Sequence, residues 1–293
     1  RMQSWGSHLS GTLPSQLMLL TDLQVISFRD QTLLHGTMPW FPSLHVLEFA
    51  MTQLSGTIPA SQLPRLQRLE IQGTRISGTL PTELGNSLNL TTIKVDAMLS
   101  GTIPTQFGRL QNLEDIRLRH FSVYLEPRTG SMFSGTLPSQ WGSLSRLQYF
   151  VCADHRLTGR LPPFSSLREI DCSGNMLSGT IPGSLFQIPS LVRVLLGNNQ
   201  FSALPKTEWR APKLYRLVLR VNRLSGTFPS FKVEDVPKLD SVNLGLNPIS
   251  GTLPSSLFQV RLCVRVCARA FCVVWHVCVC HVCVECVVCS CHS

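Results

Sequence analysis

The sequence predicts an α/β solenoid: a curved, right-handed stack of about eleven repeats with a parallel sheet on its concave face. Three observations support this. The phrase Leu-Ser-Gly-Thr-Ile-Pro occurs three times, with near copies from residue 9 to residue 254. Its glycines recur at a nearly fixed interval, as at Gly56, Gly78 and Gly101, which stand 22 and 23 residues apart. A leucine pattern precedes each phrase. A period of this length is typical of coils that contribute one strand each.

The leucine pattern is L-x-x-L-x-L-x-x-N-x-L, seen clearly at Leu167–Leu177 and Leu214–Leu224. Its alternating part predicts a short strand with two apolar side chains on one face. We expect burial at Leu47, Phe49, Leu69, Ile71, Ile170, Cys172, Leu217 and Leu219. The residues between them should face outward, as at Glu48, Glu70, Asp171 and Val218.

The asparagine and the phrase complete each coil. The asparagine can cap backbone groups of a neighbouring coil, and we expect weaker support where Thr52, Thr74 or His155 replaces it. Glycine and proline in the phrase indicate a turn. A second apolar spacing after the proline, as after Pro104 and Pro138, predicts a short helical turn on the outer wall. One coil cannot bury its own apolar edge, so stacking must do so.

The full string L-x-x-L-x-L-x-x-N-x-L-S-G-T-I-P resembles leucine-rich repeats of the plant-specific type, known from plant receptor-like proteins and receptor kinases. The wording Ser-Gly-Thr-Leu-Pro-Ser-Gln-Trp at Ser134–Trp141 is also similar to the promastigote surface antigens of kinetoplastids. The resemblance covers about residues 1–260. It implies a non-catalytic recognition or adhesion module, at the cell surface or secreted, that binds protein or glycan ligands on its concave face. The alternative is a cytoplasmic scaffold that uses the same surface.

Two regions are predicted: a solenoid over residues 1–260, which starts within a repeat, and a Cys/Val-rich tail over residues 261–293 outside the fold. The tail holds nine of the eleven cysteines. Cys283, Cys286 and Cys289 have metal-ligand spacing near His281, and Phe271–Cys291 is long enough for a membrane segment although polar residues interrupt it. Compositional bias explains both patterns more simply, because cysteines this dense produce ligand spacings by chance.

Composition and motifs narrow the function classes. The net charge of +9 is a modest excess and does not by itself indicate nucleic-acid binding. Nucleophile elbows, zinc-protease motifs and phosphate loops are absent from the sequence, so we expect no enzyme and no cofactor. Cys152 and Cys172 occupy inward strand positions, which favours two buried thiols over a disulfide. Membrane attachment in a longer chain is compatible with the resemblance.

A partner should bind where the regular coils are interrupted. Arg117, Arg119 and His120 lie beside Lys94 and precede an extra segment, Phe121–Met132. We predict a site for an acidic or glycan-bearing partner at Lys94, Arg117, Arg119, His120, Tyr124 and Tyr149. The alternative is that these are ordinary solvated strand residues. A second candidate patch comprises Arg193, Arg216 and Arg220, and Asn89 begins a glycosylation triplet that matters if the chain is secreted.

Overall fold

The computed structural model describes residues 1–6, 9–38, 43–59, 63–120, 132–229, 232–250, 263–265 and 277–278. The chain forms two compact units, Arg1–Arg156 (unit 1) and Leu157–Ser293 (unit 2). Tyr124 and the cysteines of the tail motif, Cys283, Cys286 and Cys289, lie outside the described residues.

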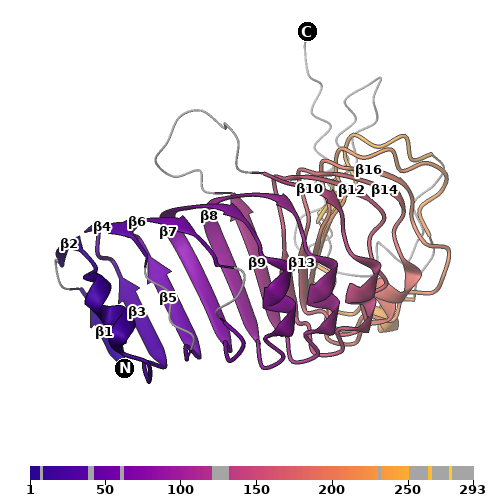
Figure 1. Cartoon of the computed structure of the whole chain (residues 1–293). Coiled ribbons are helices and arrows are strands. Elements are labelled where there is room, and N and C mark those ends of the chain that lie inside the picture. Colours follow the sequence, from indigo (N-terminus) through magenta and orange to yellow (C-terminus); the bar gives the residue numbers. More distant parts are fainter. Residues whose placement is uncertain are drawn as a thin grey trace, which may run out of the picture. The chain divides into compact units, whose positions relative to one another are not determined.

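Unit 1 contains a parallel sheet with one strand from each coil, which we call the first sheet (Figure 1). Neighbouring strands pair in register, so that Leu47 lies opposite Leu69 and Glu48 opposite Glu70. In order, the strands are β1 (Met2–Trp5), β3 (Val25–Arg29), β5 (Val46–Ala50), β7 (Arg68–Thr79), β8 (Thr92–Thr102), β9 (Asp115–His120) and β11 (Tyr149–Val151).

The predicted strand register is confirmed. All eight side chains that we expected in the core are buried, from Leu47 to Leu219. Glu48 and Glu70 lie on the opposite face from Leu47 and Phe49, because neighbouring residues of a strand point to opposite faces. They are nevertheless only 8% and 7% exposed, which the sequence did not predict. Basic side chains on the adjacent strands cover them.

The repeated phrase also forms strands, where the sequence predicted a turn. In unit 1 they make a second parallel row along the upper edge of the view in Figure 1. Close approach explains the glycine: a Cβ added at Gly101, where φ is +88°, would lie 3.0 Å from the Thr79 methyl carbon of the preceding coil. The row contains β2 (Ser10–Thr12), β4 (Leu33–Thr37), β6 (Gln53–Thr57), the ends of β7 and β8, and β10 (Phe133–Thr136).

Short helical turns follow the prolines, as predicted. Within the described residues the helices are of the 3₁₀ type, since bonds such as Leu84 N–H to the Pro81 carbonyl join residues three apart. Five residues are too few to sustain an α-helix. The turns are η1 (Ser15–Leu19), η2 (Thr82–Asn86), η3 (Thr105–Arg109), η4 (Ser139–Ser143), η5 (Gly183–Gln187) and, after Lys232, η6 (Val233–Asp235).

Unit 2 repeats the same plan. Its first-sheet strands are β13 (Glu169–Asp171), β15 (Arg193–Leu195), β17 (Arg216–Val218) and β18 (Ser241–Asn243), and all are parallel. Its second row comprises β12 (Arg156–Gly159), which begins at the last residue of unit 1, β14 (Met176–Thr180) and β16 (Gln200–Ala203).

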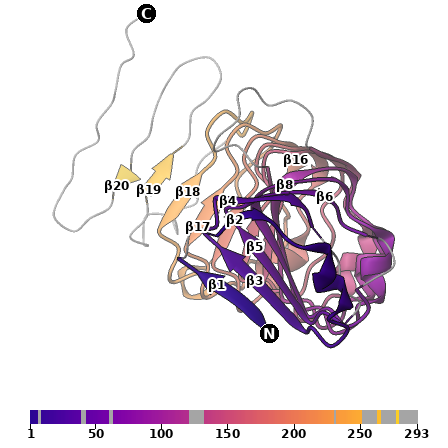
Figure 2. The same cartoon turned by 60° about the vertical axis from the view of Figure 1, so that its left-hand side comes forward.

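The described residues of the tail pair with this sheet (Figure 2). β19 (Cys263–Arg265) lies parallel to β18, and β20 (Val277–Cys278) lies antiparallel to β19. The boundary at residue 260 rests on the loss of the leucine spacing and stays a prediction. Cys152 and Cys172 are both buried as thiols.

The asparagine ladder of unit 2 confirms the predicted capping. The side-chain oxygen of Asn199 accepts a hydrogen bond from the Leu177 amide at 3.0 Å, and its nitrogen donates to the carbonyls of Cys172 at 2.8 Å and Leu196 at 3.2 Å. Asn175, Asn222 and Asn247 act in the same way. In unit 1 the support is weaker, because Thr74 accepts only from the Ile76 amide of its own coil. The His155 ring forms a hydrogen bond with the Leu118 carbonyl at 3.1 Å.

Candidate functional site

The open face of the first sheet in unit 1, which points away from the core, carries the predicted site. Strand register places Glu70 of β7 opposite Lys94 of β8, and Lys94 opposite Arg117 of β9. Side chains on one sheet face at neighbouring strands lie about 5 Å apart, so these charges interact directly. The strand register therefore places the predicted basic residues beside acidic ones.

The charges form a continuous ladder of ion pairs. Arg29 lies 3.0 Å from Glu48 and 3.6 Å from Glu70. Lys94 lies 3.0 Å from Glu70 and 3.6 Å from Asp115. The ladder continues through the Nε of Arg117, 2.8 Å from Asp115, while Arg68 reaches Glu48 and Glu70 at 3.4 and 3.9 Å. The long side chains are thus held in place on the sheet before any partner arrives.

The environment of Glu48 keeps its carboxylate charged. Burial by itself raises the pKa of Glu48, but hydrogen bonds from Ser27 and Arg29 and the charges of Arg29 and Arg68 outweigh it and lower that pKa. The bonds are short: the Ser27 hydroxyl donates at 2.9 Å and Arg29 at 3.0 Å. A charged and bonded Glu48 holds the surrounding cations in position.

An aromatic ring lies at each end of the ladder. The guanidinium of Arg117 lies over the Tyr149 ring, 5.1 Å from its centroid, and that of Arg29 lies 5.5 Å from the centroid of Trp5. Trp5 is 67% exposed. Such cation–π contacts orient the guanidinium, while donors in its plane bond to carboxylates, Arg29 to Glu48 and Arg117 to Asp115.

The predicted basic residues share one pocket. A depression of about 220 Å³, which we call the Arg119 pocket, brings Lys94, Arg117 and Arg119 together with Asp96 at the ends of β8 and β9; its lining is Gln72, Lys94, Val95, Asp96, Arg117 and Arg119. Tyr149 contacts the pocket through Arg117. His120 ends β9, and Tyr124 lies outside the described residues.

The sequence did not identify Asp115 as part of the site. Asp115 opens β9, one position before the apolar pair of its strand, and it binds both Lys94 and Arg117. The residue before the apolar pair is Tyr149 in the predicted site and Arg193 and Arg216 in the second patch, so this column was part of the prediction. Its acidic member, Asp115, was not. That column also supplies Arg68 of β7, so its charges were a usable signal.

The second predicted patch is only partly assembled. Arg193 and Arg216 are exposed neighbours in register, and Arg193 lies 3.8 Å from Glu169. Arg220 follows four residues after Arg216, packs over Gly197 and is exposed. Arg220 lies beyond the end of β17, and four extended residues span about 13 Å, so it stands apart from the pair.

Asn89 is exposed between η2 and β8. The next residue, Leu90, is fully buried, and the Thr91 hydroxyl donates to the Gln67 carbonyl at 3.0 Å. The glycosylation triplet is thus accessible at its asparagine, and modification of Asn89 stays a prediction.

No group of histidine, cysteine and acidic side chains among the described residues could hold a metal ion. None of the helices formed by the described residues has the length and apolar character that a membrane crossing requires.

Comparison with known proteins identifies the repeats. A family model described as Leucine Rich Repeat matches residues 65–87 and 166–188. No curated protein sequence matches the chain. Many solved structures do, several of them of plant proteins.

Three structures illustrate the range. The GASSHO1/SCHENGEN3 ectodomain of Arabidopsis thaliana, solved with CASPARIAN STRIP INTEGRITY FACTOR 2, is 32% identical over 89% of this chain and 32% of its own, with a TM-score of 0.76. The Arabidopsis receptor kinase HAESA, solved with the peptide hormone IDA and the co-receptor SERK1, is 28% identical over 90% and 46%, with a TM-score of 0.75. A plant ice-binding protein is 24% identical over 86% and 80%, with a TM-score of 0.63, and shares the fold alone.

The chain spans less than half the length of the two receptors. The third structure shows that one fold serves very different ligands, so the fold does not select the partner. The chain carries leucine-rich repeats, in a fold similar to that of plant receptor-kinase ectodomains.

Proposed function

We propose that the chain is a non-catalytic recognition module that binds an acidic segment of a protein or peptide in the Arg119 pocket. The observation that carries this proposal is the convergence of Lys94, Arg117 and Arg119 on one depression. Three cations face one carboxylate there, Asp96. Ion pairs to Glu70 and Asp115 hold Lys94 and Arg117 in place. Binding a partner would therefore cost little side-chain entropy at these two residues.

The comparisons support a protein or peptide partner over a glycan. HAESA, which is similar over most of this chain, binds a peptide hormone. By the same likeness we propose that the chain acts outside the cell, as a surface or secreted protein with repeats of the plant-specific type. The similarity of Ser134–Trp141 to kinetoplastid surface antigens, and attachment to a membrane in a longer chain, are parts of the same proposal.

Selection from a random peptide display library on the whole chain tests the proposal. We expect selected peptides to be rich in Asp and Glu, and their affinity to fall about tenfold in Arg117→Gln/Arg119→Gln. Glutamine is preferable to a charge reversal, because a glutamate at 117 would face Asp115 at close range. The melting temperature should change little, because both side chains lie on the open face.

The matched control is Arg193→Gln/Arg216→Gln, which removes two exposed arginines from unit 2. Loss of binding in this control with unchanged binding in the Arg117/Arg119 variant would move the site to the second patch. Selected peptides without acidic residues, together with specific binding on a glycan array, would replace the protein partner with a glycan.

A further inference from the structure

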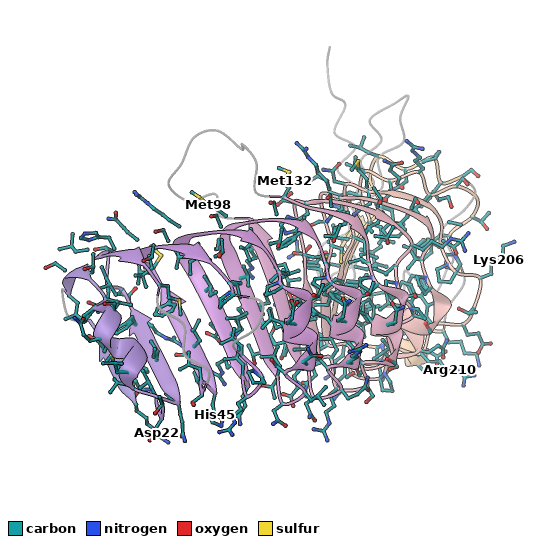
Figure 3. All side chains as sticks on the ribbon, viewed as in Figure 1. Asp22, His45, Met98, Met132, Lys206 and Arg210 are labelled. Carbon is teal, nitrogen blue, oxygen red and sulfur yellow. The ribbon has the colours of Figure 1, made fainter. Side chains whose placement is uncertain are left out.

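The open face of unit 1 has a second pocket, of about 260 Å³, that shares no lining residue with the Arg119 pocket. We call it the Arg68 pocket. Its lining includes Gln3 of β1, Val25 of β3, Val46 and Glu48 of β5, and Arg68 of β7. The pocket lies toward the lower edge of the view in Figure 3, where His45 is labelled. The backbone amide of Gln67, which lines the pocket, donates a hydrogen bond to the His45 carbonyl.

Two valines give the Arg68 pocket an apolar part among polar and charged lining residues. Val25 and Val46 pair in register on adjacent strands and are both half-buried. In the described part of the chain, these two valines are the only aliphatic residues that line the pocket. A ligand group that fits here must carry a small aliphatic part, because burying a polar group against methyls costs free energy.

Arg68 supplies the polar end. Its side chain is 47% exposed, and both of its ion pairs, at 3.4 Å to Glu48 and 3.9 Å to Glu70, use Nη1. The other edge of the guanidinium, formed by Nε and Nη2, takes part in neither. Two parallel N–H donors on one edge match the two oxygens of a carboxylate. Glu48 also lines the pocket, but its oxygens accept bonds from Ser27, Arg29 and Arg68, and it fixes the arginine.

Gln67 is exposed at the rim, and with Gln3 it offers side-chain amides beside the valines. We propose that the Arg68 pocket binds an aliphatic carboxylate, with the methyl groups on Val25 and Val46 and the carboxylate on Arg68. The C-terminal residue of a peptide and a free branched-chain acid share this chemistry. The glutamine amides favour the peptide, which alone has an amide to bond with them.

Ligand-observed NMR and calorimetry on the whole chain test the proposal with Nα-acetyl-leucine as probe. We expect binding, and at least about tenfold weaker binding of Nα-acetyl-leucinamide, which lacks the carboxylate. Arg68→Gln should weaken the binding of Nα-acetyl-leucine about tenfold. Arg68→Lys should recover part of the lost affinity, because lysine keeps the charge but lacks the two parallel N–H donors. Arg75→Gln is the matched control, since Arg75 is an exposed arginine farther along β7 that does not line the pocket.

A third probe, 4-methylpentanoate, separates the sources. Binding about fivefold weaker than that of Nα-acetyl-leucine assigns the pocket to a peptide terminus, and equal or tighter binding assigns it to a free acid. The proposal is overturned if neither acid binds, if the amide probe binds as well as the acid, or if Arg68→Gln behaves like Arg75→Gln. The comparison of probes on the unchanged chain decides the matter even if Arg68→Gln folds poorly.

Discussion

Val221 has a backbone conformation that its side chain disfavours. Its φ is +55°, in the left-handed region where branching at Cβ causes a clash. The equivalent positions of other coils hold Asp30, Asp154, Asn198, Gly73 and Gly174, and the unbranched-at-Cβ side chains of Met51 and Leu246 in two more. The coil geometry therefore imposes the conformation, and residues with short polar or absent side chains suit it better.

We predict that Val221→Asn stabilises the chain by about 1 kcal/mol, because asparagine adopts the left-handed region at lower cost. Urea denaturation of both proteins measures the difference. The control is Val218→Asn, the same change in strand β17 of the same coil, which should not stabilise. A gain in the control as large as that at Val221 would show that polarity, and not φ, was responsible.

Glu48 makes the stability of the chain depend on pH. Its pKa is lowered in the folded chain from the ordinary value of 4.5, so its stabilising contribution is present above that value. The contribution is lost as the pH falls through the lowered folded pKa. We expect the free energy of unfolding to fall between neutral pH and about pH 3, partly through this group.

Glu48→Gln provides the measurement. The variant should be less stable than the original chain at pH 7, and the gap should narrow as the pH falls, since both chains then carry a neutral group at position 48. A gap that stays constant down to pH 3 would contradict the stated role of the charge.

For single residues, the sequence predicted well which side chains are buried and poorly how polar side chains contact one another. Burial at Leu69 or Ile170 follows from strand alternation alone. The contact of Asp115 with Lys94 and Arg117 depends on which side-chain rotamers the crowded face allows, and a single sequence does not contain that information. The basic residues of the site could be predicted, and the column of Asp115 was visible in the sequence, but the contact that each basic side chain makes with a carboxylate was not.

Among the elements, the second parallel row of strands was the main feature that the sequence did not predict. Glycine and proline in the repeated phrase indicated a turn, and the positive φ of Gly101 agrees with one locally. Yet the residues on either side pair with the neighbouring coils, because stacked coils with equal spacing bring equivalent backbone groups within bonding distance. Pairing between repeats overrode the local preference of the residues.

We predict that Gly101→Ala costs more than Gly226→Ala, by about 1 kcal/mol. Both glycines have positive φ, at +88° and +83°, so both changes strain the backbone equally. A Cβ at 101 would also press on the Thr79 methyl carbon at 3.0 Å, whereas nothing lies within 4 Å of a Cβ at 226.

A double-mutant cycle with Thr79→Ser isolates the contact, because serine lacks the methyl group. The extra cost of Gly101→Ala should disappear in the Thr79→Ser background while the strain at φ remains. An unchanged cost in that background would mean that the threonine moves aside freely.

For the whole molecule, the sequence predicted the repeat architecture and left the limit of the fold open. The leucine spacing ends near Val260, while Cys263–Arg265 pairs with β18. We expect a chain shortened to residue 260 to melt within about 2 °C of the full chain, because three paired residues without a leucine pattern add little core. Thermal unfolding by circular dichroism measures this, and a drop of 5 °C or more would place the tail within the fold.

Within each unit, a different kind of side-chain bond joins neighbouring coils. The two units should therefore respond differently to acid and salt. Unit 2 relies on asparagines that join neutral backbone groups of adjacent coils, and such bonds do not respond to acid or salt. In unit 1 ion pairs on the open face add to the sheet hydrogen bonds, and acid neutralises and dissolved ions screen these pairs. Moving the chain from a neutral, dilute medium to an acidic or saline one therefore loosens the proposed binding face selectively, while the asparagine-linked half keeps its form.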